Sequence, residues 1–463
     1  MNNIFNIFKW GLRQFRKSHP ATVLLVSYLF AIGLGTCLLL MPYATVSRNI
    51  SLIDALFTAT SAVCVTGLIV VDTGTYFSLF GQGIILALIQ LGGLGIMTVS
   101  VTIFHLIGKK VLFHHRMAMQ ETFAHTPRED IYNLLKAIFI FTGIVEFFGA
   151  ILLFLHWSRE YPFEEAIYMS VFHTISAFCN AGFSLLSNSF MGFRGSLLLN
   201  LTICGLIILG GIGFPVVYEI YRQTFYLGGK RNKLSIQSKT VLVTTCILIF
   251  SGMMFFFLLE HNNSFKACSP GEGLLAALFQ SVTSRTAGFN TVDMASLGNA
   301  TSVLVIFLMF VGASPGSCGG GIKTTTLAVL GAFTWSRFRR QIRVNMFRKS
   351  IPRESISKSI SIVILSISLI TIVFSLLLVS QQGGLADAGT GQEFRAFLFE
   401  TVSAFGTVGL SMGATSEINN WGKLLIVIMM LIGRVGVLTF SYLIAGSEPQ
   451  NGIEYAEENI MLG

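Results

Sequence analysis

Four short stretches of this chain place a glycine after a run of small and hydroxyl-bearing residues, and each run begins at a phenylalanine. The glycines are Gly67, Gly182, Gly288 and Gly409. The phenylalanine stands ten residues before the glycine in three stretches, and nine before it in the stretch that begins at Phe279. Because glycine adopts positive φ and has no side chain, the backbone at each site can leave a helix and continue extended, with its carbonyls turned to one side.

Carbonyls that face a common point can bind a cation. Four such segments around one axis would replace the water shell of a dehydrated ion, and the C-terminal dipoles of the preceding helices would add negative potential. A divalent ion would favour a ring of carboxylates, and the pattern therefore predicts a monovalent cation held by backbone. The side chains beside the glycines are neutral: Val65, Thr66, Asn180, Ala181, Thr286, Ala287, Thr407 and Val408.

The composition indicates a membrane protein with many spans. Hydrophobic residues make up 53% of the 463 residues and charged residues only 11%, and the mean hydropathy is +0.71. A soluble surface needs far more charge. Several segments reach the roughly 20 apolar residues that cross a bilayer, which predicts an all-α polytopic membrane fold.

One unit recurs four times along the chain. Each unit comprises an apolar span, a half-length helix, a glycine turn and a second apolar span, which indicates duplication within one chain. The half-length helices are expected at about 52–63, 164–177, 272–282 and 392–403. The units are expected at 20–108, 130–222, 238–335 and 358–446, and a tail follows at 447–463.

The half-length helices are too short to span and are followed by irregular backbone. Such backbone is tolerated at membrane depth only where protein or a water-filled path satisfies its polar groups. Four re-entrant loops around one central pore, related by pseudo-fourfold symmetry, are therefore expected. The alternative, four ordinary outer loops of a helical bundle, needs four coincidental glycine turns.

The second span of the third unit differs from the others. Its residues 313–326 contain Pro315 and four glycines, which a regular helix does not tolerate. We expect a broken helix with a loop under the pore. The glycine pairs in the other second spans are explained by close helix packing.

Most of the 31 lysines and arginines lie at the N-terminus and in the linkers between units. The positive-inside rule then places the N-terminus and the linkers in the cytoplasm. The basic run 337–353 fits orientation and contact with anionic lipid head groups better than nucleic-acid binding. A lipid bilayer, and no nucleic acid, is the expected environment.

The glycine stretches, with Asn180-Ala-Gly-Phe183, Ser284-Arg-Thr-Ala-Gly-Phe-Asn290 and Thr407-Val-Gly-Leu410, resemble the Trk/Ktr/HKT superfamily of potassium transporters. The resemblance covers about residues 20–446 and is strongest to the KtrB branch. It implies that the four glycines, together with the neighbouring residues named above, form a K+ selectivity filter. Serine replaces the first glycine in some Na+-selective plant relatives, whereas this chain has glycine in all four.

The same resemblance implies a gate below the filter. It makes 313–326 an intramembrane gating loop, with Pro315, Gly316, Gly319, Gly320, Gly321 and Lys323, and places Arg434 at the narrow point. A lone guanidinium in a pore raises a barrier to cations and is costly without partners. A purely structural Arg434, paired with the loop or its carbonyls, is the alternative.

The resemblance also implies partners. These are a homodimer with one pore per subunit, in which 454–463 could take part, and a cytosolic RCK-type ring (KtrA) that binds ATP or ADP. Na+ is the implied activator and K+ the transported ion, with no covalent cofactor. Nucleotide control would come only through the partner subunit.

Arg285, a set of acidic residues and His173 have less direct roles. Arg285 is expected to brace the filter loop through carbonyls or Asp293. Acidic residues, among them Asp54 and Glu400, are expected on the outer side, as a solvated rim that could also concentrate cations. His173 lies in the second half-length helix, at a polar position behind the filter.

The sequence thus predicts K+ uptake across the plasma membrane and no enzymatic activity. A Na+ or mixed-cation transporter of the same superfamily is the alternative. An intramembrane enzyme is a distant one, because no apposed Asp pair, His-Glu-x-x-His helix or Ser/His dyad is visible.

Overall fold

The structure, a computed structural model, describes residues 20–95, 131–225, 234–266, 268–381 and 391–445. The predicted unit ends at 96–108, 130 and 446 and the tail 447–463 lie outside these residues. The regular secondary structure of the described residues is helical, apart from one short hairpin, β1 (Asn345–Met346) paired antiparallel with β2 (Lys349–Ser350).

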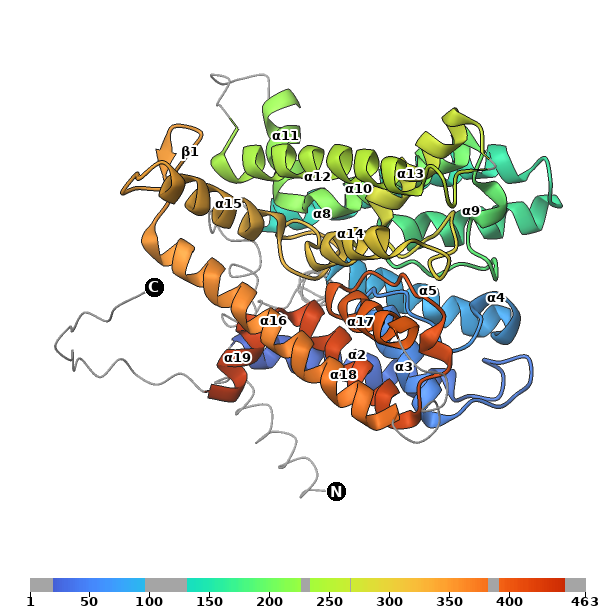
Figure 1. Cartoon of the computed structure of the whole chain (residues 1–463). Helices are drawn as coiled ribbons and strands as arrows, with labels where there is room; N and C mark the ends of the chain where they lie inside the picture. The colour runs from blue at the N-terminus through green and yellow to red at the C-terminus, as the bar shows by residue number, and fades with distance from the viewer. Residues whose placement is uncertain (1–19, 96–130, 226–233, 267, 382–390, 446–463) are drawn as a thin grey trace.

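Four helices are long and apolar enough to cross a membrane, and a fifth span is added if one bent pair counts as one. Figure 1 shows the helices lying broadly along one direction, with α4 (Thr73–Tyr76) at one end and the β1 hairpin at the other. The predicted all-α polytopic membrane fold is confirmed. The long helices are α2 (Pro20–Leu39), α8 (Ile131–Trp157), α12 (Ile236–Glu260) and α16 (Arg353–Gln381).

A half-length helix follows each long helix. Their observed bounds differ by at most three residues from those expected from the sequence. A serine cap explains two of the starts: the Ser51 side chain accepts from the Asp54 N–H, and Ser269 forms a reciprocal capping box with Glu272. The half-length helices are α3 (Leu52–Val63), α9 (Phe163–Phe178), α13 (Pro270–Thr283) and α17 (Gly391–Gly406).

The next helix of each set packs against the half-length helix of the following set. These helices are α5 (Leu79–Leu94), α10 (Leu197–Ile212), α14 (Asn299–Phe310) and α18 (Asn420–Val435). Thus α5 packs on α9, α10 on α13, α14 on α17 and α18 on α3. The contacts run in a closed cycle, so the four half-length helices surround a common centre.

These second helices are broken at glycines in more places than the sequence predicted. Only the third was expected to break, yet α10 and α11 (Phe214–Phe225) meet at Gly213, φ 100°, with a bend of 93° between 197–212 and 214–223. Likewise, α18 and α19 (Val437–Ala445) meet at Gly436, φ 96°. Only glycine adopts these values without strain. In the third set, residues 311–323 separate α14 from α15 (Thr324–Phe338).

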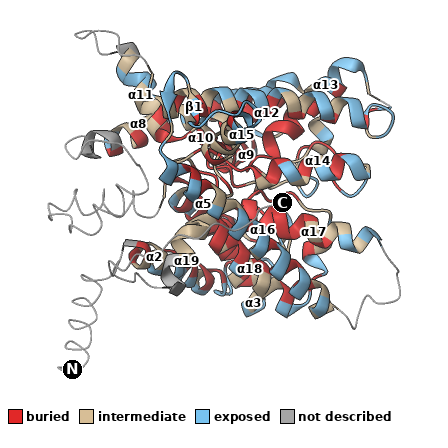
Figure 2. Ribbon diagram, turned by 60° about the vertical axis from the view of Figure 1, so that its left-hand side comes forward, coloured by how far each residue is buried: buried red, intermediate tan, exposed pale blue. Residues whose placement is uncertain are grey.

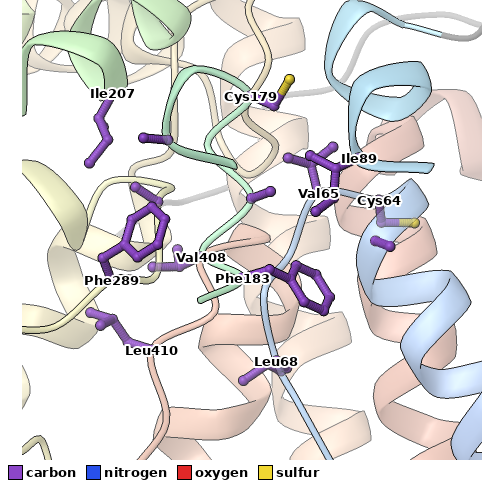
Figure 3. Close-up of a cluster of buried hydrophobic side chains, with 14 of the residues drawn as sticks. Cys64, Val65, Leu68, Ile89, Cys179, Phe183, Ile207, Phe289, Val408 and Leu410 are labelled. Carbon is purple, nitrogen blue, oxygen red and sulfur yellow. The ribbon is translucent and has the colours of Figure 1, made fainter. Parts of the chain in front are cut away.

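The buried residues gather where the half-length helices meet the extended segments that follow them (Figure 2). The phenylalanines that begin the four glycine stretches are all fully buried. So are the large apolar residues directly after the glycines, of which Leu68, Phe183, Phe289 and Leu410 appear in Figure 3. Their burial fixes the extended segments from behind, which leaves the backbone as the inner surface.

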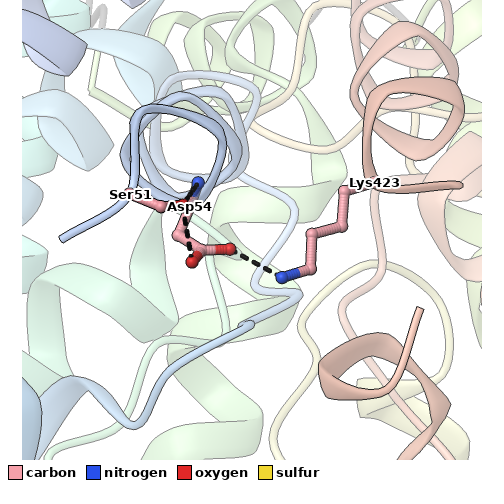
Figure 4. Close-up of polar contacts among 3 residues, drawn as sticks. All are labelled: Ser51, Asp54 and Lys423. Atoms are coloured by element: carbon pink, nitrogen blue, oxygen red, sulfur yellow. Dashed lines mark hydrogen bonds and ion pairs between the residues drawn. The ribbon is translucent and has the colours of Figure 1, made fainter. Parts of the chain in front are cut away.

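An ion pair closes the cycle between the first and last sets of helices. The Lys423 Nζ of α18 lies 2.7 Å from an Asp54 carboxylate oxygen of α3, and the Ser51 hydroxyl donates to the other carboxylate oxygen at 2.8 Å (Figure 4). Asp54 was expected on a solvated rim. It instead joins two elements that are far apart in the sequence.

The tight packing of α5 generates a stability prediction. A Cβ at Gly81 would lie 2.0 Å from the Ala44 carbonyl oxygen, whereas a Cβ at Gly83 would have nothing within 4 Å. We therefore expect Gly81→Ala to destabilise the fold by about 1–3 kcal/mol through overpacking. Gly83→Ala should be neutral or stabilising by up to about 1 kcal/mol. Thermal unfolding in detergent measures both, and equal shifts would contradict the packing.

Candidate functional site

The half-length helices end on a shared backbone pattern in three of the four sets. The residue two before the glycine has positive φ at Val65 (57°), Asn180 (59°) and Thr407 (49°). The next N–H then reaches back to the helix, as where Thr66 donates to the Ser61 carbonyl at 2.8 Å. This is a left-handed helix end, which turns the chain sharply out of the helix.

The third set is one residue shorter and ends differently. Ala287 N–H donates to the Thr283 carbonyl at 2.9 Å, and Thr286 does not have positive φ. The glycine that follows still matches its counterparts, with φ of 79° at Gly288. The one-residue difference seen in the sequence is therefore absorbed at the helix end and not at the glycine.

The four glycines lie next to one another in a closed ring. Their φ values are 87° at Gly67, 70° at Gly182, 79° at Gly288 and 88° at Gly409. A Cβ on Gly67 would lie 2.3 Å from the carbonyl oxygen of Ala181, and a Cβ on Gly409 would lie 2.1 Å from that of Thr66.

The remaining two glycines complete the ring in the same way. A Cβ on Gly182 would lie 2.5 Å from the Ala287 oxygen, and one on Gly288 would lie 2.4 Å from the Val408 oxygen. Each glycine thus faces the carbonyl just before the next glycine in the cycle. No side chain fits at any of the four positions.

A hydroxyl group at the end of each half-length helix holds the extended segment, and sequence reasoning missed this set. Ser61 accepts the Gly67 N–H at 3.1 Å and donates to the Leu68 carbonyl at 2.7 Å. Ser176 and Thr283 donate to the carbonyls after their glycines, and Ser403 accepts the Gly409 N–H. A signal was present, because Ser or Thr stands four residues after each initial phenylalanine.

The residue after each initial phenylalanine braces the chain further outward in three sets. His173 accepts the Leu185 N–H at 3.3 Å, and Gln280 donates to the Thr291 hydroxyl at 3.2 Å. Glu400 accepts from Ser411, Thr415 and the Met412 N–H. Glu400 is fully buried, so its predicted place on a solvated rim is wrong, because the returning chain folds over it.

The polar side chains beside the glycines differ in their hydrogen-bond partners. Asn180 and Thr286 are 2.7 Å apart and link the second and third segments. The Thr407 hydroxyl accepts the Gly320 N–H from the loop of the third set at 2.9 Å. The buried Thr66 hydroxyl has no hydrogen-bond partner among the described residues.

The loop 311–323 lies directly against the inner ends of these segments. A Cβ at Gly319 would lie 2.7 Å from Thr286, and one at Gly320 would lie 2.5 Å from the Thr407 hydroxyl oxygen. Gly321 has positive φ, as does Gly316 next to Pro315. The glycines of the loop therefore let its backbone pass close under the ring.

The loop is held by its neighbours on two sides. Ser314 N–H donates to the Gly211 carbonyl and Cys318 N–H to the Gly210 carbonyl, both at 3.1 Å. Gly321 N–H donates to the Gly433 carbonyl at 3.3 Å. Within the loop, the Lys323 ammonium donates to the Gly319 carbonyl at 2.8 Å.

Arg434 joins the loop to the first set of helices. Its guanidinium donates to the Cys318 carbonyl of the loop, to the Gly92 carbonyl of α5 and, at 3.3 Å, to the Tyr28 hydroxyl of α2. Arg434 is therefore paired with a carbonyl of the loop, as the structural alternative predicted. The pairing also places a cation next to the loop below the ring.

Arg285 lacks the brace expected for it. Its side chain is buried, and its Nε has no hydrogen-bond partner among the described atoms. The Asp293 carboxylate accepts the Ala295 N–H instead. The predicted pairing with Asp293 is wrong, because the Arg285 side chain is buried whereas Asp293 is exposed.

In the described part of the chain, no group of three or more His, Cys, Asp or Glu side chains could hold a metal ion. The polar groups that lie against the ring glycines are the backbone carbonyls of the neighbouring segments. The chemistry that such a ring supports is the transient binding of a weakly hydrated monovalent ion.

Comparisons with known proteins agree with this geometry. Residues 4–454 match a family model described as "TrkH: Cation transport protein". The chain is 36% identical to the Ktr system potassium uptake protein B of Vibrio alginolyticus, covering 98% of this chain and 97% of the relative. It is 37% identical to the protein of the same name from Bacillus subtilis, covering 96% and 97%.

Two further matches broaden the comparison. The potassium/sodium uptake protein NtpJ of Enterococcus hirae is 34% identical, with 97% of this chain and 98% of that protein covered. The crystal structure of the potassium transporter TrkH from Vibrio parahaemolyticus aligns with a TM-score of 0.69 and 20% identity, covering 92% of this chain and 84% of that one. At that identity the match shows a shared fold.

The hydrogen bonds of the Ser61 hydroxyl predict that this side chain stabilises the ring. Ser61→Ala leaves the Gly67 N–H and the Leu68 carbonyl without this partner, at a cost of about 1–3 kcal/mol. We expect a lower unfolding temperature and weaker discrimination of K+ from Na+ in cellular uptake. Ser366→Ala is the control, because the buried Ser366 hydroxyl donates only to the Ile362 carbonyl of its own helix. Unchanged discrimination in Ser61→Ala would contradict the bracing role.

Proposed function

Because the chain belongs to the TrkH family of cation transport proteins, we propose that it is the ion-translocating subunit of a Ktr-type system that takes up K+ across the plasma membrane. The ring of four positive-φ glycines carries this proposal. The names of the relatives from Vibrio alginolyticus and Bacillus subtilis support K+ as the ion.

In this proposal the ring is the selectivity filter. A K+ ion sheds its water and is held by carbonyls of Val65 to Gly67, Asn180 to Gly182, Thr286 to Gly288 and Thr407 to Gly409. The four helix C-termini that end just before these residues favour a cation there. Several N–H groups of these segments are paired, such as those of Thr66 and Ala181 with helix-end carbonyls and that of Gly67 with the Ser61 hydroxyl. The carbonyls are the groups that we propose to bind the ion.

Residues 313–326, which comprise most of the loop 311–323 and the first residues of α15, act as the gate together with Arg434. The loop lies under the filter, and the Arg434 guanidinium and Lys323 ammonium both sit beside it. Two cations below a cation filter raise the barrier to exit. Opening would require the loop to release its hydrogen bonds with Arg434 and with the carbonyls of Gly433 and Gly210.

The proposal extends to assembly and orientation. We place the N-terminus in the cytoplasm and assign the protein a homodimer and a cytosolic RCK-type ring (KtrA) that binds ATP or ADP. Na+ serves as the activating ion. The Ktr system names of the relatives support a partner subunit, and the basic linkers support the orientation.

A second candidate function is transport of both K+ and Na+. The observation in its favour is the 34% identity to a relative named a potassium/sodium uptake protein. Glycine at all four ring positions favours K+ selection. Uptake measured with K+, Rb+ and Na+ in turn separates the two, since a mixed transporter would carry Na+ at a rate close to that of K+.

The filter assignment predicts that Gly288→Asp abolishes selective uptake. Left-handed backbone costs a non-glycine residue about 1–2 kcal/mol, and the new Cβ would lie 2.4 Å from the Val408 carbonyl oxygen. Since about 1.4 kcal/mol is a tenfold change in rate, we expect K+ uptake in a K+-transport-deficient cell to fall at least about tenfold.

Gly271→Asp is the matched control for the added carboxylate. Gly271 lies in the first turn of α13, and a Cβ there has nothing within 4 Å. This variant should transport normally. Normal uptake with unchanged selectivity in Gly288→Asp would overturn the filter.

The gate assignment predicts the opposite effect. Arg434→Ala, or deletion of residues 316–321, removes the barrier or the loop and should raise K+ flux several-fold in reconstituted vesicles. Arg159→Gln, an exposed cation at the far end of α8, should leave the flux unchanged. If both gate variants show the flux and regulation of the unaltered protein, the loop and Arg434 are not the constriction.

A further inference from the structure

Residues of α8 and α11 line a groove. Figure 1 shows α11 towards the end of the molecule where the β1 hairpin lies. The volume of the groove is about 560 Å³. The groove exists because the chain bends by 93° near Gly213 and carries α11 away from the axis of α10. It is separate from the filter and gate described above.

The groove has an apolar wall and a basic end. Ile140, Phe141 and Val217 supply apolar lining, while Lys136 at the start of α8 and Arg222 near the end of α11 supply the charges. Both charged residues are exposed, as is the lining residue Tyr221. Tyrosine with lysine or arginine beside an apolar surface is typical of the boundary between lipid tails and head groups.

The apolar wall continues along the outer face of α8. Ile140, Ile144 and Phe147 are 51%, 51% and 64% exposed, and Phe148 and Ile151 follow on the same helix. In a membrane-spanning helix, such a face lies against acyl chains. A single molecule could therefore place its polar end between Lys136 and Arg222 and its tail along this face.

We propose that the groove binds an anionic phospholipid, with the phosphate between Lys136 and Arg222 and one acyl chain along α8. Arginine and lysine both bind phosphate, the first through a planar fork and the second as a point charge. Basic pockets between membrane helices are known to take acidic lipid head groups. The apolar wall requires a lipid and not free phosphate.

Occupancy of the groove reaches the gating loop, and this consequence rests on the proposed function of that loop. Phe214 lines the groove, and its N–H donates to the Gly316 carbonyl of the loop at 2.9 Å. A Cβ on the preceding Gly213 would lie 2.5 Å from the Pro315 carbonyl oxygen. A lipid that holds α11 against α8 would therefore fix the position of the loop.

Binding is tested without transport, by native mass spectrometry of the purified full-length protein titrated with phosphatidylglycerol or phosphatidylcholine. We expect the protein to retain phosphatidylglycerol in preference. The double variant Lys136→Gln/Arg222→Gln should retain at least fivefold less of it. Val217→Trp, which fills the apolar part without changing charge, should also lose it. The control Arg159→Gln/Lys266→Gln removes two exposed charges outside the groove and outside the basic run 337–353, and should bind as the unaltered protein does.

Several outcomes overturn the site. Equal retention by the Lys136/Arg222 variant and its control would show that net charge alone attracts the lipid. Full competition by glycerol phosphate would show a free-phosphate site. No retention by the unaltered protein would mean that another part of the chain or a second copy fills the groove.

Coupling to the loop is tested separately, by K+ uptake into vesicles of phosphatidylglycerol and of phosphatidylcholine. Dependence of uptake on phosphatidylglycerol that is lost in Lys136→Gln/Arg222→Gln supports the coupling. Loss of lipid binding with equal uptake in both lipids overturns the coupling. Absence of uptake by the unaltered protein in either lipid would count against the proposed transport function and leave the binding result standing.

Discussion

A backbone that leaves its helix inside a membrane must find a partner for every amide group, because no water is there to supply one. The extended segments at the ring glycines meet part of this demand locally. Several of their N–H groups donate to helix-end carbonyls, and those of Gly67 and Gly409 donate to the Ser61 and Ser403 hydroxyls. The carbonyls of Thr66, Ala181, Ala287 and Val408 lie against the neighbouring ring glycines. The ring therefore combines paired amide donors with carbonyls that pack against glycine backbone.

The same constraint explains the loop below the ring. Residues 311–323 leave helical structure at membrane depth, and their N–H groups bond to the carbonyls of Gly210, Gly211 and Gly433. These carbonyls lie at the ends of broken helices, where the next turn is missing and the acceptors would otherwise be unpaired. The breaks near Gly213 and Gly436 thus supply the acceptors that the loop needs. Arg434 donates to two further carbonyls, those of Cys318 in the loop and Gly92 in α5.

Much of this fold could be predicted from the sequence because it depends on the pattern of residues within single segments. Apolar length identified the spans, and the spacing from phenylalanine to glycine located the half-length helices within three residues. What was missed depends on contacts between segments. The breaks at Gly213 and Gly436, and the burial of Glu400 by the chain at 411–415, follow from how neighbouring segments pack, which a single stretch does not reveal. Arg285 was paired with the wrong residue because the burial of its side chain and the exposure of Asp293 cannot be seen in the sequence.

The third glycine segment, at 279–289, differs from the other three and so shows which features the ring requires. It lacks one residue, and with it the left-handed residue that ends the other three half-length helices. It retains two features: a hydroxyl, Thr283, that donates to the carbonyl after the glycine, and a glycine at φ 79°. The ring still closes, with Gly288 against the Val408 carbonyl as closely as its counterparts. A left-handed residue at the helix end is therefore not required to place the glycine in the ring. The glycine and the hydroxyl behind it are the parts that set the position of the carbonyls.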